Sequence, residues 1–177
     1  MSESYSRIKK VYIYGGEGSG KSSLIIRLTT GEYSNEHIPT TEIYSKTLKI
    51  KKNVKLYEVP MCEFDASDVK EEEGTLNVVL IDPFSDNNVR LDLFSSAALD
   101  RTIILVTKID LLRSPLSPEI KKKYLKCKSG SHGIISTRSC YNIPHFHDFL
   151  GKKFKDHLIS DYGDLFERFL KTKLRAI

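Results

Sequence analysis

The most constraining feature of this sequence is the glycine-rich segment 15–22, which reads Gly-Gly-Glu-Gly-Ser-Gly-Lys-Ser. It lies between an apolar run at 11–14 and a helical pattern that begins near Lys21, so it joins a predicted strand to a predicted helix. Such a loop can turn successive backbone N–H groups toward an anion, and the positive end of the helix dipole reinforces them. The segment therefore predicts a phosphate-binding loop of the form G-x-x-x-x-G-K-[ST].

The residues of this loop have distinct predicted roles. The Lys21 ammonium is expected to contact terminal phosphates, and the Ser22 hydroxyl is expected to ligate Mg²⁺. Glycines supply the backbone freedom that a tightly curled loop needs. A chance glycine-rich turn is the alternative, but it leaves the strand before and the helix after unexplained. The predicted nucleotide-binding residues here are Gly15, Glu17, Gly18, Ser19, Gly20, Lys21, Ser22 and Ser23.

Composition narrows the class of protein. The chain has 177 residues, 40% hydrophobic and 29% charged, which is typical of one globular domain. Its net charge is +5, but the lysines form short separate clusters without interleaved aromatic residues, so nucleic-acid binding is not expected. The longest apolar runs, 78–81 and 103–106, are too short to span a bilayer, and the 3 cysteines fit no metal-binding spacing. We therefore expect a cytoplasmic protein without a transmembrane segment.

Strand and helix patterns alternate along the chain, which favours an α/β domain with a mostly parallel sheet. Continuous apolar runs at 76–81 and 102–106 are typical of central strands buried on both faces. Residues 41–52 show a period of two and turn at Asn53 into 54–59, which predicts a hairpin and one antiparallel strand. The other predicted elements are strands 10–14 and 134–136, helices 21–30, 117–126 and 144–158, and a short helix between 82 and 101.

Two short motifs at predicted strand ends concern base recognition. Residues 106–110 read Val-Thr-Lys-Ile-Asp, and Asp110 can accept two hydrogen bonds from the N1–H and 2-amino groups of guanine, a pair that adenine does not offer. The Lys108 stem can lie over the base plane. The predicted base-binding residues of this motif are Thr107, Lys108 and Asp110. A second segment, Ser136-Thr137-Arg138, follows the last predicted strand.

Together with the phosphate loop, these segments resemble the motifs of the Ras superfamily of small GTPases, namely N/T-K-x-D and the S-A-K loop whose backbone N–H contacts the guanine oxygen. The resemblance adds Ser136, Thr137 and Arg138 to the predicted base-binding residues. The resemblance implies a P-loop NTPase G domain, with a mostly parallel six-stranded sheet, one antiparallel strand and helices on both faces. It covers about residues 8–158 of a single domain, and an additional amphipathic helix is expected at 161–177. It also implies GTP/GDP and Mg²⁺ as cofactors, and protein effectors or regulators as partners.

The first switch of this family contains a threonine that follows a proline and touches Mg²⁺ and the terminal phosphate. The resemblance carries this role to Thr40, and Thr41 is the neighbouring alternative. The segment could instead be a plain Pro-Thr turn that leads into the next strand and has no part in binding. The final residues contain no cysteine for a lipid anchor, so membrane contact is expected only through partners.

The sequence departs from the family at positions that concern hydrolysis. In the segment that corresponds to D-x-x-G-Q, the aspartate is replaced by Glu58, the glycine by Met61, and the water-orienting glutamine by Cys62. Glu17 adds a negative charge where the Ras pattern has a glycine. We therefore expect a molecular switch in signalling or vesicle trafficking with slow or impaired GTP hydrolysis. The alternatives are a pseudo-GTPase that docks partners, and an ATP-using P-loop enzyme with Asp82 as its acidic residue.

Overall fold

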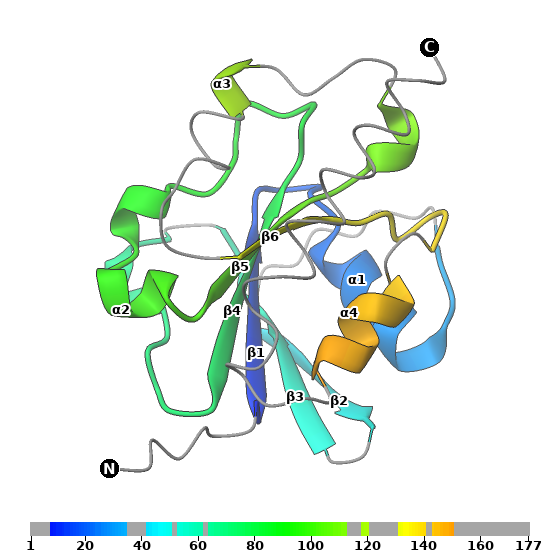
Figure 1. Cartoon of the computed structure of the whole chain (residues 1–177), viewed down its shortest axis with the longest axis horizontal. Helices are drawn as coiled ribbons and strands as arrows, with labels where there is room; N and C mark the ends of the chain where they lie inside the picture. The colour runs from blue at the N-terminus through cyan, green and yellow to red at the C-terminus, as the bar shows by residue number, and fades with distance from the viewer. Residues whose placement is uncertain are drawn as a thin grey trace.

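A six-stranded sheet with the order β2-β3-β1-β4-β5-β6 forms the centre of the molecule in this computed structural model (Figure 1). The structure describes residues 8–34, 42–50, 53–61, 64–112, 118–120, 131–140 and 143–150. The strands are β1 (Lys10–Gly15), β2 (Tyr44–Lys49), β3 (Asn53–Glu58), β4 (Thr75–Ile81), β5 (Thr102–Val106) and β6 (Ser131–Ile134). Strand β2 pairs antiparallel with β3, and the other four pairings of the sheet are parallel. The predicted mostly parallel six-stranded sheet with one antiparallel strand is confirmed.

Helices lie on both faces of this sheet, as predicted. Figure 1 shows α1 and α4 together on one face and the short α2 on the other. The described α-helices are α1 (Lys21–Thr30), α2 (Ser96–Leu99), α3 (Pro118–Ile120) and α4 (Ile143–Leu150). Three single 3₁₀ turns follow β3, β4 and β5, namely η1 (Ala66–Asp68), η2 (Leu91–Leu93) and η3 (Ile109–Leu111). The short helix expected between 82 and 101 is present as α2, whose bounds lie within that range.

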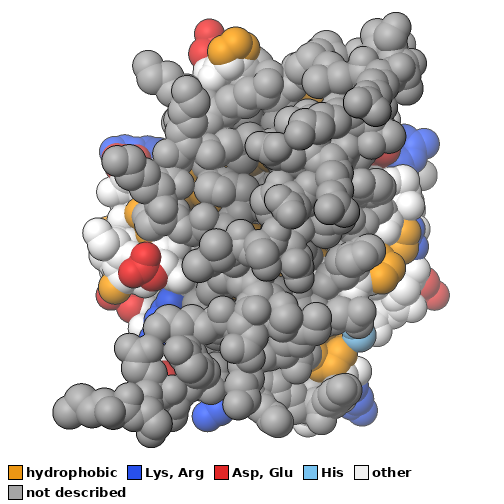
Figure 2. All heavy atoms as spheres, in the orientation of Figure 1, with side chains coloured by type: hydrophobic (Ala, Val, Ile, Leu, Met, Phe, Trp, Pro, Cys, Tyr) orange, Lys and Arg blue, Asp and Glu red, His pale blue; other side chains and the backbone are white. Residues whose placement is uncertain are grey.

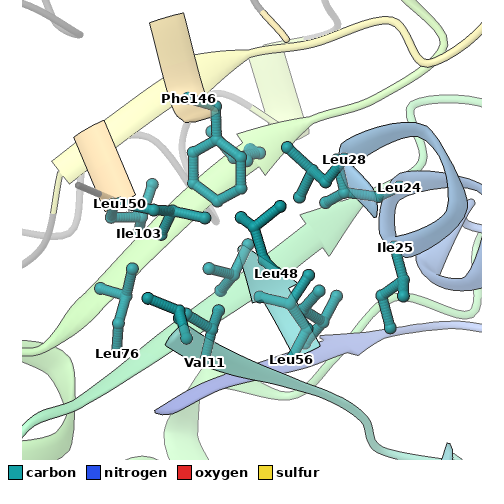
Figure 3. Packing of buried hydrophobic residues seen from close by; sticks show 14 of the residues in the cluster. Val11, Leu24, Ile25, Leu28, Leu48, Leu56, Leu76, Ile103, Phe146 and Leu150 are labelled. Carbon is teal, nitrogen blue, oxygen red and sulfur yellow. The ribbon is translucent and has the colours of Figure 1, made fainter. Parts of the chain in front are cut away.

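The alternation of side chains along β1 divides the apolar interior into two clusters. Val11 and Ile13 face the cluster under α1 and α4, whereas Tyr12 and Tyr14 face the one under α2. Figure 3 shows the first cluster, in which Phe146 and other residues of α1 and α4 meet the strands. Because β1 is covered on both sides, the loop that follows it is attached to the most rigid part of the sheet.

The last strand is the clearest correction to the predicted elements. Residues 134–136 were expected to form it, but β6 runs from Ser131 to Ile134. Its parallel register places Ser131 beside Ile103 and Ile134 beside Val106. Hydrogen bonding to the exposed edge of β5 decides this strand, because Ser131, His132 and Gly133 have little strand propensity of their own. Ser136 consequently lies in the loop beyond the strand.

Several predictions fall outside the described residues. These include the switch threonines Thr40 and Thr41, the cysteine at position 62 and the amphipathic stretch 161–177. Figure 2 shows charged side chains of both signs at the rim of one face of the molecule, among the residues that the structure describes. Within that same part of the chain, every helix is too short or too polar to cross a membrane.

Candidate nucleotide-binding site

The predicted phosphate-binding loop leaves β1 at Gly15 and enters α1 at Lys21, at the carboxyl end of a central parallel strand. Gly18 and Gly20 have positive φ angles of 71° and 99°, which side-chain-bearing residues rarely adopt. Gly20 is also the N-cap residue of α1 and provides no side-chain cap for the first turn. The N–H groups of the first turn and the positive end of the helix dipole lie at this point, an arrangement that suits a bound anion.

Lys21 folds its side chain back over this loop. Its Nζ donates to the carbonyl oxygens of Gly15 at 2.9 Å and Gly16 at 3.2 Å, and the residue is only 8% exposed. Burial lowers the pKa of Lys21, and the nearby charges of Glu58 and Glu17 oppose that shift. A buried ammonium whose hydrogen-bond partners are neutral carbonyls gains energy when a phosphate replaces them. The lysine thus lies over the loop for which phosphate binding is predicted.

Ser22 and Glu58 form an oxygen pair next to Lys21. The Ser22 hydroxyl lies 2.9 Å from Oε1 and 2.8 Å from Oε2 of Glu58, to which it donates. Glu58 ends β3 and is 2% exposed. Although longer than the aspartate of the family pattern, it still brings a carboxylate to Ser22. Mg²⁺ in phosphate sites usually takes one or two protein oxygen ligands and completes its shell with phosphates and waters, so this pair fits the ion.

The segment that follows β4 packs closely against the phosphate-binding loop. A Cβ atom on Gly16 would lie 1.9 Å from the carbonyl oxygen of Asn87, so the backbone approach itself requires glycine there. Asn88 holds this segment in place, because its side chain accepts from the backbone N–H of Asp82 at 2.9 Å and donates to its carbonyl oxygen at 3.0 Å. Gly16 had no predicted role, because the backbone that packs against it is about 70 positions away in the sequence.

The end of β5 connects the phosphate loop with the predicted base site. The Thr107 hydroxyl donates to the carbonyl oxygens of Ser19 at 3.1 Å and Ile81 at 3.3 Å. Lys108 has a φ of 55°, and its Nζ donates to Asp82 Oδ2 at 2.6 Å. That ion pair fixes the far end of the side chain whose stem was predicted to lie over the base. Asp82 was predicted only as an alternative acid for an ATP-using enzyme.

The two segments predicted to recognise the base meet in the structure. The Ser136 hydroxyl donates to Asp110 Oδ1 at 2.6 Å, and the backbone N–H of Ser139 donates to the Ser136 hydroxyl at 3.0 Å. Asp110 is exposed to solvent at its position in η3. Carbonyl oxygens of Thr137 and Arg138 accept hydrogen bonds from Arg27 of α1 at 2.8 and 3.0 Å. Arg27 was missed by sequence reasoning, because its partners are 110 and 111 positions away along the chain.

The remaining predicted residues have less defined surroundings. Glu17 is exposed at the tip of the phosphate-binding loop, and Ser23 is half-buried in the first turn of α1. Met61 is partly buried and packs against the cluster under α2. The glycine of the family pattern has no side chain, so it could not make this contact with the interior.

Comparison with known protein families supports the prediction of a phosphate-binding loop at 15–22. A family model described as the Ras family matches residues 10–60, which include the phosphate-binding loop and strands β1 to β3. No curated protein matches the chain. The base-recognition residues lie beyond the matched segment, so their assignment rests on the residues themselves and on the contact between Ser136 and Asp110.

Proposed function

We propose that this chain, a divergent G domain of the Ras superfamily, binds GDP and GTP together with Mg²⁺. The observation that carries the proposal is the assembly of three segments, the phosphate-binding loop and the two predicted base motifs, at the carboxyl ends of the parallel strands. Thr107, in the base motif, is hydrogen-bonded to Ser19 of the phosphate-binding loop at 3.1 Å. Ser136 is hydrogen-bonded to Asp110 at 2.6 Å. A ligand with phosphates and a guanine base matches both halves of this arrangement.

The proposed binding mode uses the groups already in place at the phosphate end. Backbone N–H groups of the loop and of the first turn of α1 bind phosphate oxygens, and Lys21 moves its ammonium from the loop carbonyls onto the ligand. Ser22 and Glu58 hold Mg²⁺, with Thr40 as a further proposed ligand. When bound, the ion neutralises phosphate charge.

Guanine selectivity is proposed to come from Asp110. Its carboxylate accepts from N1–H and the 2-amino group, and Ser136 fixes its orientation. Loss of a charge-assisted hydrogen-bond pair costs on the order of 3 kcal/mol, so ATP should bind about a hundredfold more weakly than GTP. An ATP-using enzyme with Asp82 as its acidic residue is the weaker candidate. Asp82 pairs with Lys108, and the carboxylate beside Ser22 belongs to Glu58 instead.

We further propose that hydrolysis is slow and that the protein is a switch in signalling or trafficking that acts through protein effectors or regulators in the cytoplasm. Glu17 adds negative charge close enough to Lys21 to affect its pKa, in the region where charge develops during phosphoryl transfer. A docking module without turnover is the second candidate, favoured by the packing of Met61 against the core. That contact limits any response of this segment to the terminal phosphate.

The test is to identify and then measure the bound nucleotide. The purified protein is denatured and the released nucleotide is identified by mass spectrometry. Calorimetry then compares the affinities of the protein for GDP, GTP and ATP in the presence of Mg²⁺. We expect guanine nucleotide, and we expect Asp110→Asn to weaken GDP about a hundredfold while favouring xanthosine diphosphate. Glu119→Gln is the control, because that exposed acid lies in α3 and belongs to none of these motifs. Equal affinities for ATP and GTP would contradict the proposal.

A further inference from the structure

Arg27, near the end of α1, uses its guanidinium to bind three backbone carbonyl oxygens, two in the loop at 137–138 and one just beyond its own helix. Its Nε donates to the carbonyl oxygen of Thr137 at 2.8 Å, and one terminal nitrogen donates to that of Arg138 at 3.0 Å. The other terminal nitrogen donates to the carbonyl oxygen of Gly31, just beyond the helix, at 2.7 Å. The guanidinium also lies 5.9 Å from the centre of the Tyr33 ring. A planar group with fixed donor directions can hold all these partners in one arrangement.

These contacts determine which way the loop's own N–H groups point. In a trans peptide the carbonyl and the following N–H point in opposite directions. With the Thr137 carbonyl held toward α1, the N–H of Arg138 points away from the helix. With the Arg138 carbonyl held in the same way, the N–H of Ser139 points toward the Ser136 hydroxyl, to which it donates at 3.0 Å. One peptide plane therefore links Arg27 to the hydroxyl that orients Asp110.

We propose that Arg27 is a positioning residue for guanine recognition, which aligns the peptides of 137–139 so that their N–H groups serve the 6-oxygen of the base and the Ser136–Asp110 pair. This inference rests on the proposed function. It adds that base selectivity depends on a residue of the phosphate-binding helix. Lys21 and Arg27 are six positions apart, about 9 Å along α1. Phosphate binding and base recognition are thus fixed to the same rigid element.

The first experiment compares Arg27→Gln and Arg27→Lys with the control Arg90→Gln. Arg90 is an exposed arginine that precedes η2 and pairs with Asp92 at 2.6 Å, outside the phosphate-binding loop and both predicted base motifs. We expect both Arg27 variants to bind GDP at least about tenfold more weakly, the loss of about one charge-assisted hydrogen bond. Binding of tripolyphosphate, which has no base, should stay close to that of the unmodified protein. Lysine keeps the charge but lacks the fork, so it should not rescue GDP binding.

A second measurement separates positioning from general stability. The analogue 6-thio-GDP keeps N1–H and the 2-amino group but carries sulfur, a weak acceptor, in place of the 6-oxygen. The unmodified protein should prefer GDP to this analogue, and in the Arg27 variants the preference should shrink toward equality. A merely destabilised domain would lose affinity for both ligands alike and keep their ratio.

A third measurement needs no nucleotide. Arg138 is exposed, so trypsin can cut after it whenever the loop opens. Cleavage at this bond should be faster in Arg27→Gln than in Arg90→Gln, while the other bonds that both variants retain are cut at the same rate. If Arg27→Gln fails to fold, Arg27→Lys carries the comparison.

The outcomes for this inference and for the proposed function differ. GDP binding by the unmodified protein, with affinity, analogue preference and cleavage unchanged in the Arg27 variants, would overturn the role of Arg27 and leave the proposed function standing. A protein that binds tripolyphosphate but no guanine nucleotide would contradict the proposed function, and the role of Arg27 with it.

Discussion

Replacement of Glu58 by glutamine should make nucleotide binding depend on much higher Mg²⁺ concentrations. Glutamine keeps the length of the side chain and an oxygen that can accept the hydrogen bond now made by Ser22 at 2.8 to 2.9 Å. The variant therefore removes one negative charge and little else from a position that is 2% exposed. Any change in Mg²⁺ dependence then reports on the charge.

The size of the effect follows from electrostatics at a buried site. Opposite unit charges about 4 Å apart attract by about 4 kcal/mol at an effective dielectric constant of about 20, and a divalent ion doubles this figure. The cost of keeping the carboxylate out of water cancels a large part of that gain. We therefore expect a net loss of about 2 kcal/mol, which corresponds to about a thirtyfold weaker affinity for Mg²⁺.

The assay is the dissociation rate of a fluorescent GDP analogue, measured across a titration of Mg²⁺. Glu72→Gln is the matched control, because Glu72 is an exposed glutamate that pairs with Lys10 at 2.7 Å, at the start of β1, whereas the phosphate-binding loop follows the other end of that strand. A half-saturating Mg²⁺ concentration within about twofold of the unmodified protein would refute the reasoning. That result would mean that Glu58 serves Ser22 alone and contributes nothing to the ion.

Three further predictions concern turnover, pH and packing. Single-turnover phosphate release from the GTP-bound protein should be about a hundredfold slower than in an ordinary Ras-type protein, and Cys62→Gln with Glu17→Gly should recover more activity than Cys62→Gln alone; an ordinary rate would show that another group orients the water. Burial holds the pKa of Lys21 below its usual 10.5, so the folded protein loses this proton at a lower pH than the unfolded chain does. Between the lowered pKa and 10.5 the unfolded chain binds more protons, so the free energy of unfolding should rise with pH over that window. A phosphate anion opposes that shift, so GDP affinity should fall over the same window, and a flat profile would contradict the reasoning. Gly16→Ala should lower the free energy of unfolding by about 1–3 kcal/mol, since its Cβ would lie 1.9 Å from the Asn87 carbonyl oxygen. An unchanged melting temperature would show that the neighbouring loop moves aside at no cost.

Local sequence was sufficient for the phosphate end of the site. The bounds of α1, Lys21–Thr30, agree with the predicted helix 21–30, and the glycines at 18 and 20 adopt the positive φ angles that their residue type allows. The apolar runs at 76–81 and 102–106 correspond to β4 and β5, buried on both faces. In each case consecutive residues determine the outcome, because backbone conformation and hydrophobic periodicity are properties of a short segment.

The tertiary structure alone decided how the base end is built. Sequence indicated Asp110 and Ser136 separately, but only the parallel pairing of β5 with β6 places them 2.6 Å apart, and that pairing moved the strand itself away from its predicted bounds. The Lys108–Asp82 ion pair and the reach of Arg27 to the loop at 137–138 had no local signal. Their partners are 26 to 111 positions apart, so their contacts depend on sheet register and on the packing of α1, which no short stretch of residues specifies.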